Sequence, residues 1–152
     1  MRTRQLIICC AVLFHGMTSC STDKDESSTN PVFGTWRVVQ VQISNEAIPQ
    51  TTPEDENISL SFIEGGSFTG RTSVNQLSGR YELNDSTLTM LEFTTTEAAD
   101  TAFAAVFYNA IAEAQVPNET FAPFDYRLSG SNLILAFGDS GQMVLENNSQ
   151  YQ

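Results

Sequence analysis

Residues 58–70 read Ile-Ser-Leu-Ser-Phe-Ile-Glu-Gly-Gly-Ser-Phe-Thr-Gly, and they carry the clearest signal of secondary structure in the chain. Apolar and polar side chains alternate from Ile58 to Phe62, which is the period-two pattern of a β-strand with one buried face. Glu64-Gly65-Gly66 then supplies turn residues before a second extended run at Ser67–Gly70. Because glycine adopts the positive φ angles of tight hairpin turns, the stretch predicts an antiparallel hairpin.

A second hairpin follows the first. Residues 79–83 and 87–91 both alternate, and Asn84-Asp85-Ser86 lies between them as a turn. Each of these strands is short and marginally stable alone. We therefore expect the set to close on itself or to pack on another element.

Further strands lie on either side of the two hairpins. Three short apolar runs, at 124–128, 133–137 and 142–145, are separated by turns that contain glycine. Upstream, residues 36–43 alternate except at a Val-Val pair, which predicts a bulge or bend in that strand. Residues 44–57 hold two prolines and four acidic residues and are predicted as a loop. In the strand at 36–43 we expect four inward-facing side chains: Trp36, Val39, Val41 and Ile43.

One helix is predicted between the second hairpin and the last three strands. Its apolar residues fall at helical spacing and form one stripe over four turns. Thr94 with Glu97 predicts a capping box at its start, with Thr96 as an alternative N-cap, and Pro117 ends it. We expect this stripe to cover a sheet or barrel opening rather than to line a ligand pocket. It consists of Ala99, Ala102, Phe103, Val106, Phe107, Ala110, Ile111 and Ala114.

Seven or eight short strands and one helix predict a single domain that is mainly β, with one packed helix (α+β). The architecture that fits is a small, antiparallel, partly open barrel. We expect its core to contain Trp36, Phe62, Tyr81, Phe103 and Phe107.

Residues 1–19 are typical of a bacterial lipoprotein signal peptide. Two arginines precede the nine-residue apolar run Leu6–Phe14, which is too short for a bilayer-spanning helix of about 20 residues. Met17-Thr18-Ser19-Cys20 follows and resembles a lipobox, in which lipid is attached to the cysteine thiol and the signal is cleaved before it. The sequence therefore predicts Cys20 as a lipid attachment site and a membrane contact through that anchor. The alternative is an ordinary secretory signal with a chance cysteine.

Residues 20–31 are predicted as an acidic, flexible tether. No apolar side chain occurs from Ser21 to Asn30, so the segment cannot bury enough surface to offset its ordering entropy. Its acidic stretch, Asp23–Glu26, resembles the signal that some Gram-negative lipoproteins use to reach the outer leaflet. We expect an outer-membrane, lipid-anchored location, surface-exposed if that signal operates. A solvated spacer that carries no address is the alternative.

The composition argues against several function classes. Eighteen Asp+Glu stand against seven Lys+Arg, and the formal net charge is −11, which argues against a nucleic-acid partner. The only His and all three Cys lie within the first 20 residues. The chain after Cys20 therefore lacks a His general base, a cysteine nucleophile and the usual zinc ligands. We expect a protein that is not an enzyme and needs no metal or cofactor.

Four short motifs resemble the META-domain family of HslJ-like heat-shock proteins and lipoproteins. They are Gly34-Thr35-Trp36, Phe68-Thr69-Gly70, Val74-Asn75 and Gly79-Arg80-Tyr81, followed by a corner at Thr94–Thr96. The resemblance covers about 32–146 and leaves 147–152 as a tail. It implies a lipocalin-like topology with a helix packed on antiparallel strands, and it implies no established reaction. The signature positions it marks as structural are Gly34, Trp36, Gly70, Asn75, Gly79 and Tyr81.

The chain departs from the family pattern at two cysteine positions. Val74 replaces the signature Cys, and Ala98 or Ala99 stands where many members carry a second Cys. A redox or disulfide role of those cysteines is therefore not carried over. Losing both together makes sense if the two positions are neighbours, since a lone thiol is a liability in an oxidising compartment.

Candidate chemistry in the folded part is sparse. Asn75 is expected to hydrogen-bond backbone groups at a turn, with ligand contact as the alternative. Glu54-Asp55-Glu56 lacks the alternating spacing of a calcium loop. The acidic residues form no recognisable glycosidase pair.

Three functions from different classes remain open. The first is a non-catalytic, envelope-anchored domain that contacts another envelope protein or serves in envelope stress. The second is a carrier that holds a small apolar ligand in the barrel mouth, and the third is a hydrolase that works with carboxylates alone. A large apolar cavity favours the carrier, whereas a filled interior favours the first function.

Overall fold

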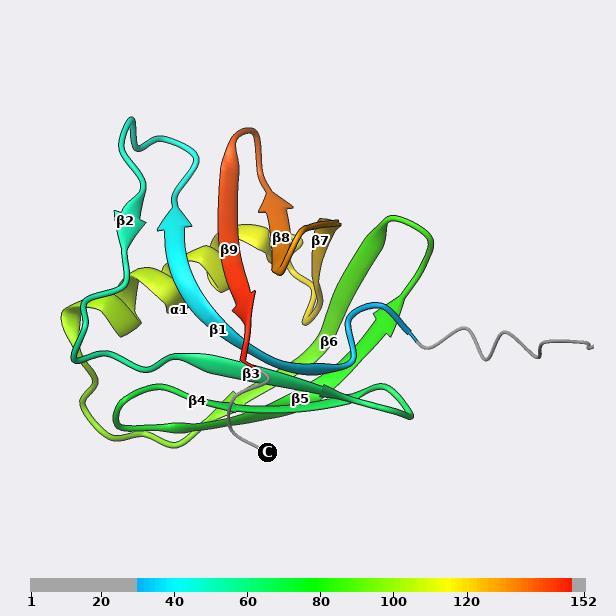
Figure 1. Ribbon diagram of the computed structural model, residues 1–152, viewed down its shortest axis with the longest axis horizontal. Helices are drawn as coiled ribbons and strands as arrows, with labels where there is room; N and C mark the ends of the chain where they lie inside the picture. The colour runs from blue at the N-terminus through cyan, green and yellow to red at the C-terminus, as the bar shows by residue number, and fades with distance from the viewer. Residues whose placement is uncertain (1–29, 149–152) are drawn as a thin grey trace, which may run out of the picture.

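A computed structural model describes residues 30–148 of the chain as nine strands and one helix (Figure 1). No helix in these residues is both long and apolar enough to cross a membrane. The predicted signal peptide, Cys20 and almost all of the predicted tether lie outside the described part. In chain order the elements are β1 (Gly34–Gln42), β2 (Gln50–Thr51), β3 (Ser59–Ile63), β4 (Ser67–Arg71), β5 (Gln76–Leu83), β6 (Thr87–Thr95), α1 (Ala102–Ala114), β7 (Ala122–Ser129), β8 (Asn132–Phe137) and β9 (Gly141–Asn147).

Eight of the strands form a closed antiparallel barrel. The order is β1-β3-β4-β5-β6-β7-β8-β9, and pairing of β1 with β9 closes the ring. The two-residue strand β2 pairs with the end of β1 beside this ring. The predicted fold class, mainly antiparallel β with one helix in a small barrel, is confirmed. The ring is closed where the prediction left it partly open, because β9 runs along most of β1.

Both predicted hairpins are present. β3 and β4 pair up to Ile63 and Ser67 around the two glycines, and β5 and β6 pair up to Leu83 and Leu88. Gly65 and Gly66 have positive φ angles, which explains why glycine occupies this turn. The segment 44–57, predicted as a loop, contains β2, and the last strand extends to Asn147.

Strand β1 carries the predicted bulge, but its inward side chains differ from the prediction. The register shifts between Val38 and Gln40. Val38 is fully buried, whereas Val39 and Ile43 are half-buried. Because of the bulge, Val38 rather than Val39 faces inward. The alternating pattern alone did not show which of the two valines is buried.

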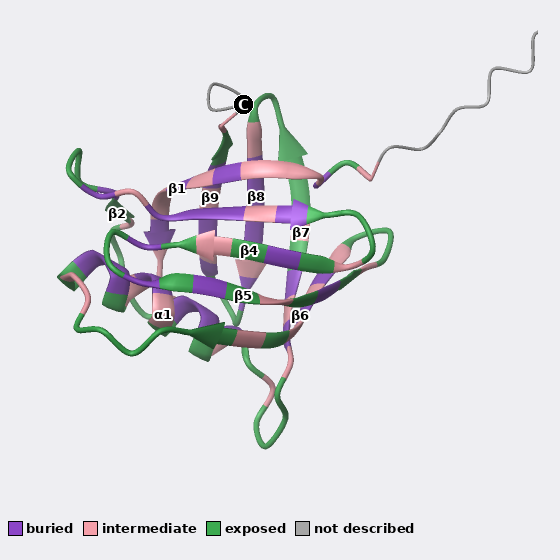
Figure 2. Ribbon diagram, turned by 90° about the horizontal axis from the view of Figure 1, so that it is seen from below, coloured by how far each residue is buried: buried purple, intermediate pink, exposed green. Residues whose placement is uncertain are grey.

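Side chains fill the interior of the barrel. Figure 2 shows buried positions alternating along the strands, as expected for a barrel with one face inside. Trp36, Phe62, Tyr81, Phe103 and Phe107 all belong to one hydrophobic core, which confirms that prediction. Its largest completely enclosed side chains include Phe68, Phe107, Phe124, Met90 and Leu135.

The helix begins later than the capping motifs predicted. α1 starts at Ala102, and Thr101 is its N-cap, with its Oγ1 accepting a hydrogen bond from the Ala104 N–H at 3.1 Å. Neither Thr94 nor Thr96 caps the helix, because the strand β6 continues to Thr95. Ala99 consequently lies before the helix. The buried face is Phe103, Ala104, Phe107, Ala110, Ile111 and Ala114, and it packs against β1, β7, β8 and β9.

Strands β6 and β7 pair only in part, and this shapes one side of the barrel. Their register covers Thr87–Met90 of β6 and ends where Met90 lies opposite Ala122. Beyond a bulge at Leu91, β6 remains paired with β5 on its other side from Glu92 to Thr95. Among residues 30–148 no strand pairs with Leu91–Thr95 on the side away from β5, and α1 lies there instead.

Candidate functional site

Asn75 forms a buried clamp between the β4–β5 turn and the segment before α1. Its Oδ1 accepts hydrogen bonds from Thr96 Oγ1 at 2.7 Å and from the Ala98 N–H at 3.0 Å. Its Nδ2 donates to the Ala98 carbonyl oxygen and to Asp100 Oδ2, both at 2.9 Å. The side chain is only 2% exposed, so all its hydrogen-bonding capacity is used inside the protein. The backbone-binding interpretation of Asn75 agrees with this geometry.

Asp100 is the acidic centre of the same clamp. Its Oδ2 also accepts hydrogen bonds from Thr72 Oγ1 at 2.5 Å and from the Tyr108 hydroxyl at 3.1 Å. Desolvation by burial acts to raise the pKa of Asp100. Hydrogen bonds from Thr72, Asn75, the Thr101 backbone N–H and Tyr108 outweigh it, so the pKa lies below its usual range.

The clamp therefore joins three segments that are distant in sequence. Thr72 directly follows β4, Asp100 directly precedes the helix N-cap, and Tyr108 lies on the helix. Sequence reasoning singled out Asn75 but missed both Thr72 and Asp100. The signal for Asp100 was present, because Asp-Thr directly before an apolar stripe is a typical helix start.

Two signature glycines leave room for close packing between strands. At Gly79 an added Cβ would collide with the Glu92 carbonyl oxygen and lie 2.6 Å from the Phe68 ring. At Gly70 it would collide with the Ser59 carbonyl oxygen. Gly34 has a positive φ of 122° at the start of β1, a conformation that other residues rarely adopt.

The two signature aromatic residues each combine burial with one hydrogen bond. Trp36 Nε1 donates to the Val32 carbonyl oxygen at 2.8 Å, which ties the entry of the chain to β1. Tyr81 packs edge-on against Phe62 with ring centroids 5.0 Å apart, and its hydroxyl donates to the Ile63 carbonyl oxygen at 3.1 Å. Burial raises the pKa of Tyr81. Both residues therefore stabilise the fold and are not part of an exposed contact surface.

The positions that replace family cysteines lie around the clamp. Val74 is 48% exposed and adjoins Asn75, whose side chain binds the backbone N–H and C=O of Ala98. The two positions are therefore held near each other, which agrees with the expectation that they are neighbours.

Two of the acidic residues of the Glu54-Asp55-Glu56 run, Glu54 and Glu56, line one pocket together with Glu146 and Arg37. In the described residues, no group of three or more His, Cys, Asp or Glu side chains has the geometry to hold a metal ion. Glu82 is exposed on β5, whereas Glu56 is buried in its loop and accepts a hydrogen bond from Ser73 Oγ at 2.7 Å.

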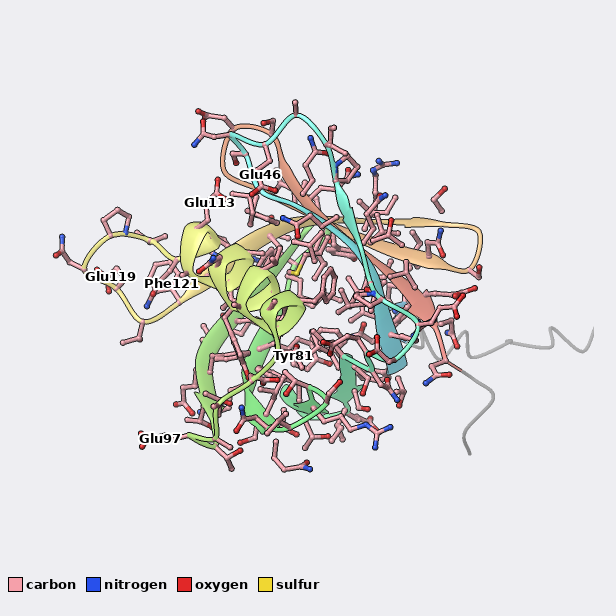
Figure 3. The ribbon with its side chains drawn as sticks, turned by 90° about the vertical axis from the view of Figure 1, so that its left-hand side faces the viewer. Glu46, Tyr81, Glu97, Glu113, Glu119 and Phe121 are labelled. Carbon is pink, nitrogen blue, oxygen red and sulfur yellow. The ribbon has the colours of Figure 1, made fainter. Side chains whose placement is uncertain are left out.

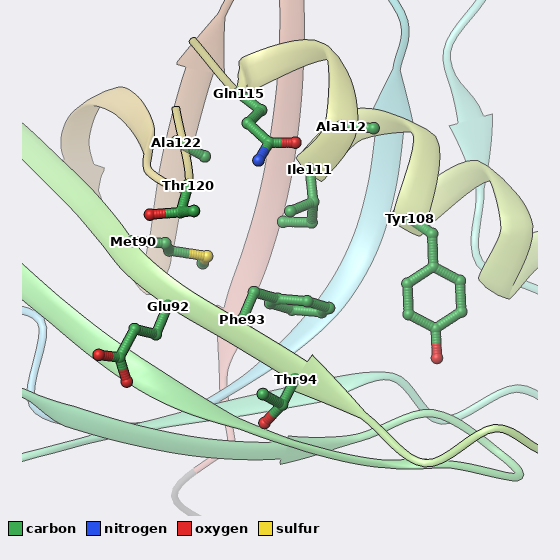
Figure 4. A pocket seen from close by; sticks show the side chains of 10 residues that line it. All are labelled: Met90, Glu92, Phe93, Thr94, Tyr108, Ile111, Ala112, Gln115, Thr120 and Ala122. Atoms are coloured by element: carbon green, nitrogen blue, oxygen red, sulfur yellow. The ribbon is translucent and has the colours of Figure 1, made fainter. Parts of the chain in front are cut away.

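An apolar groove lies on the side of the barrel where β6 and β7 separate (Figure 4). It has a volume of about 560 Å³. Figure 4 shows Phe93 directed toward α1, while Glu92 and Thr94 point away from it. No sequence pattern indicated this groove, because it depends on where two distant strands part. Its lining is Met90, Glu92, Phe93, Thr94, Tyr108, Ile111, Ala112, Gln115, Thr120 and Ala122.

The protein is a small closed β-barrel domain with one packed helix. Its signature residues, Asn75 among them, hold the fold together. The META domain family matches residues 30–150, and the chain belongs to this family. This confirms the resemblance seen in the sequence. The matched range includes all six signature positions.

Two solved structures share the fold. The chain is similar to a protein from Burkholderia xenovorans, solved by NMR, with a TM-score of 0.57 and 13% identity over 76% of this chain and 82% of that one. It is also similar to a DUF4847 family protein from Bacteroides vulgatus, with a TM-score of 0.53 and 18% identity over 78% of this chain and 95% of that one. No curated protein matches the chain.

Proposed function

We propose that this protein is a lipid-anchored, non-catalytic binding module of the bacterial outer membrane that contacts another envelope protein. The observation that carries the proposal is the Met17-Thr18-Ser19-Cys20 motif directly after a nine-residue apolar run. Two or three acyl chains on one cysteine anchor a protein stably, because each buried CH₂ contributes about 0.8 kcal/mol. The META barrel is the part that such an anchor presents.

The chemistry of the barrel supports a non-catalytic role. A carboxylic acid that protonates a substrate near neutral pH needs a raised pKa. The pKa of Asp100 is instead held below its usual range by four hydrogen bonds within the clamp. Asp100 therefore stabilises the fold and stays ionised.

The place where the predicted tether joins the barrel supports the proposal that the groove stays accessible in the anchored protein. Pro31 lies beside the β5–β6 turn at Asn84–Ser86. That turn precedes the start of β6 at Thr87, whereas the groove adjoins the far half of the same strand. An anchor attached through residues 20–31 therefore joins the barrel away from the groove.

A carrier of a small apolar ligand is the second candidate. The groove favours it, since its volume of about 560 Å³ is within the usual range for ligand sites and its floor is apolar. It lies on the flank of the barrel, however, and the barrel mouth predicted for a carrier leads into an interior filled by side chains. The filled interior is why the binding module is preferred.

The anchor is tested with the Cys20→Ala variant and a metabolic palmitate label. We expect label and outer-membrane fractionation in the wild type, and neither in Cys20→Ala. Cys10→Ala is the matched control, because it removes a thiol ten residues earlier and should keep both properties. Unlabelled wild-type protein, or a Cys20→Ala variant that stays membrane-bound after a carbonate wash, would overturn the anchor.

A further inference from the structure

The far half of β6 has a free edge beside the apolar groove. β5 holds Glu92–Thr95 on one side, beyond a bulge at Leu91, and on the other side Leu91–Thr95 borders the apolar groove. Unpaired strand edges present backbone N–H and C=O groups that can template another strand, and natural proteins usually cover or blunt them. Five residues at about 3.4 Å each give an edge of about 17 Å, long enough for a short extended peptide.

We propose that the groove binds an extended peptide of a partner protein, which adds as a strand to the Leu91–Thr95 edge of β6. This deepens the proposed binding role by naming the chemistry of the partner. Backbone hydrogen bonds to β6 supply the docking, and alternate side chains of the peptide enter or leave the groove.

The side chains of β6 specify which peptide fits. Phe93 points into the groove, where Met90 and Ile111 extend the apolar floor (Figure 4). Glu92 and Thr94 point outward, so the side chains beside them on an added strand lie in solvent. Because opposite charges across strands attract and apolar pairs pack, the peptide should alternate apolar residues with Lys or Arg.

Acidic residues near the groove in sequence support the same choice, because Glu119 precedes the lining residue Thr120 and Glu97 follows β6 by two residues. Figure 3 shows Glu97, just beyond the end of β6, and Glu119, in the loop after α1, on the same side of the view. Glu92 is the only charged residue in the lining. Arg80 lies opposite Glu92, but on β5, which is the side of β6 away from the groove. The surface therefore offers acidic groups to a basic partner.

The first test selects peptides from a phage-displayed library of random eight-residue sequences. The bait is the full chain, recovered from whichever cell fraction contains it, so failure of the lipid anchor leaves the peptide test intact. We expect enrichment of sequences that alternate apolar residues with Lys or Arg. Absence of enrichment, or enrichment of acidic sequences, would overturn the proposal.

Two tryptophan variants locate the binding site of a selected peptide. Ala112 is exposed on α1 and lines the groove, so Ala112→Trp should fill the groove and weaken binding at least tenfold. Asn109 is exposed on the same helix outside the groove lining, and Asn109→Trp should change binding less than twofold. Equal binding by both variants would place the peptide elsewhere and refute the site. If Ala112→Trp fails to fold, Glu92→Lys must weaken binding at least tenfold instead.

Hydrogen exchange distinguishes an added strand from a ligand that only fills the groove. With the selected peptide bound, those amides of 91–95 that do not bond β5 should exchange at least tenfold more slowly, while those of the turn at 64–66 should not change. The competing occupant is probed with 8-anilinonaphthalene-1-sulfonate, a small apolar dye. A peptide that displaces the dye without protecting the β6 amides would rule out strand addition and favour the carrier.

Discussion

The hydrogen bonds of the Asn75 clamp allow the loss of unfolding free energy in the variant Asn75→Ala to be predicted. The substitution removes four hydrogen bonds, to Thr96, to both backbone groups of Ala98 and to Asp100. A typical intramolecular hydrogen bond contributes about 1 kcal/mol net. Ala98 is exposed, so its freed backbone groups can regain water, and we expect a loss of about 3 kcal/mol rather than the full sum.

The expected loss converts to a measurable shift in the thermal midpoint. A folded part of about 119 residues has an unfolding entropy of about 0.25 kcal/mol/K. A loss of about 3 kcal/mol therefore lowers Tm by about 12 °C, which circular dichroism or scanning calorimetry can follow. Asn84→Ala is the matched control, because Asn84 is exposed in a turn and should shift Tm by less than 2 °C.

A second substitution at the same position separates the clamp from a ligand-binding role. Asn75→Asp keeps the shape but places a carboxylate where Nδ2 now donates to Asp100 Oδ2 at 2.9 Å. Two adjacent carboxylates repel when both are ionised. The variant should therefore be less stable than the wild type at pH 7, by an amount that shrinks toward pH 4. An Asn75→Ala protein within 3 °C of the wild type, or an Asn75→Asp protein of wild-type stability at pH 7, would refute the reasoning.

Three further predictions concern the core and the acid limit of stability. Gly79→Ala should lower the unfolding free energy by about 2–3 kcal/mol, because the new methyl collides with backbone and with the Phe68 ring; a urea-melt change below 0.5 kcal/mol would contradict this. Trp36 is the only tryptophan, so its fluorescence should be blue-shifted in the folded protein and move to the red on unfolding. A solvent-like emission from native protein would show that Trp36 is not buried. Trp36→Ala should lower the unfolding free energy by about 3–5 kcal/mol. The folded pKa of Asp100 is depressed, so its contribution is present above the ordinary pKa of about 4 and is lost as pH falls through the folded pKa. Stability should fall more steeply between pH 4 and pH 2 in the wild type than in Asp100→Asn, and parallel curves would contradict the assignment.

The strands could be predicted from the sequence because their signals are local. Alternation at Ile58–Phe62 and the glycines of the following turn reflect one pleated face and one tight turn, and both appear in the structure as expected. The helix start was harder, since threonine is a good N-cap and also a good strand residue. Thr94 and Thr96 compete for the cap in sequence, and only the pairing of β6 with β5 extends the strand to Thr95.

The site was predictable only where one residue carries the signal. Asn75 stands out as a lone amide in a turn, whereas its partner Asp100 lies 25 positions away and is brought to it by the barrel. The groove has no signal in any single segment. It exists because the pairing of β6 with β7 stops at Met90, and a pairing limit between distant strands depends on the whole fold. The same holds for the choice of Val38 over Val39 as the inward residue.

Crosslinking from the groove in living cells tests most directly the claim that this META domain is a binding module. A photo-reactive amino acid is placed at Ala112, in the groove, and in a second strain at Asn109, on the same helix but outside the groove lining. We expect a discrete adduct with an envelope protein from position 112 and none from position 109. Equal adducts from the two positions, or no adduct from position 112, would contradict it.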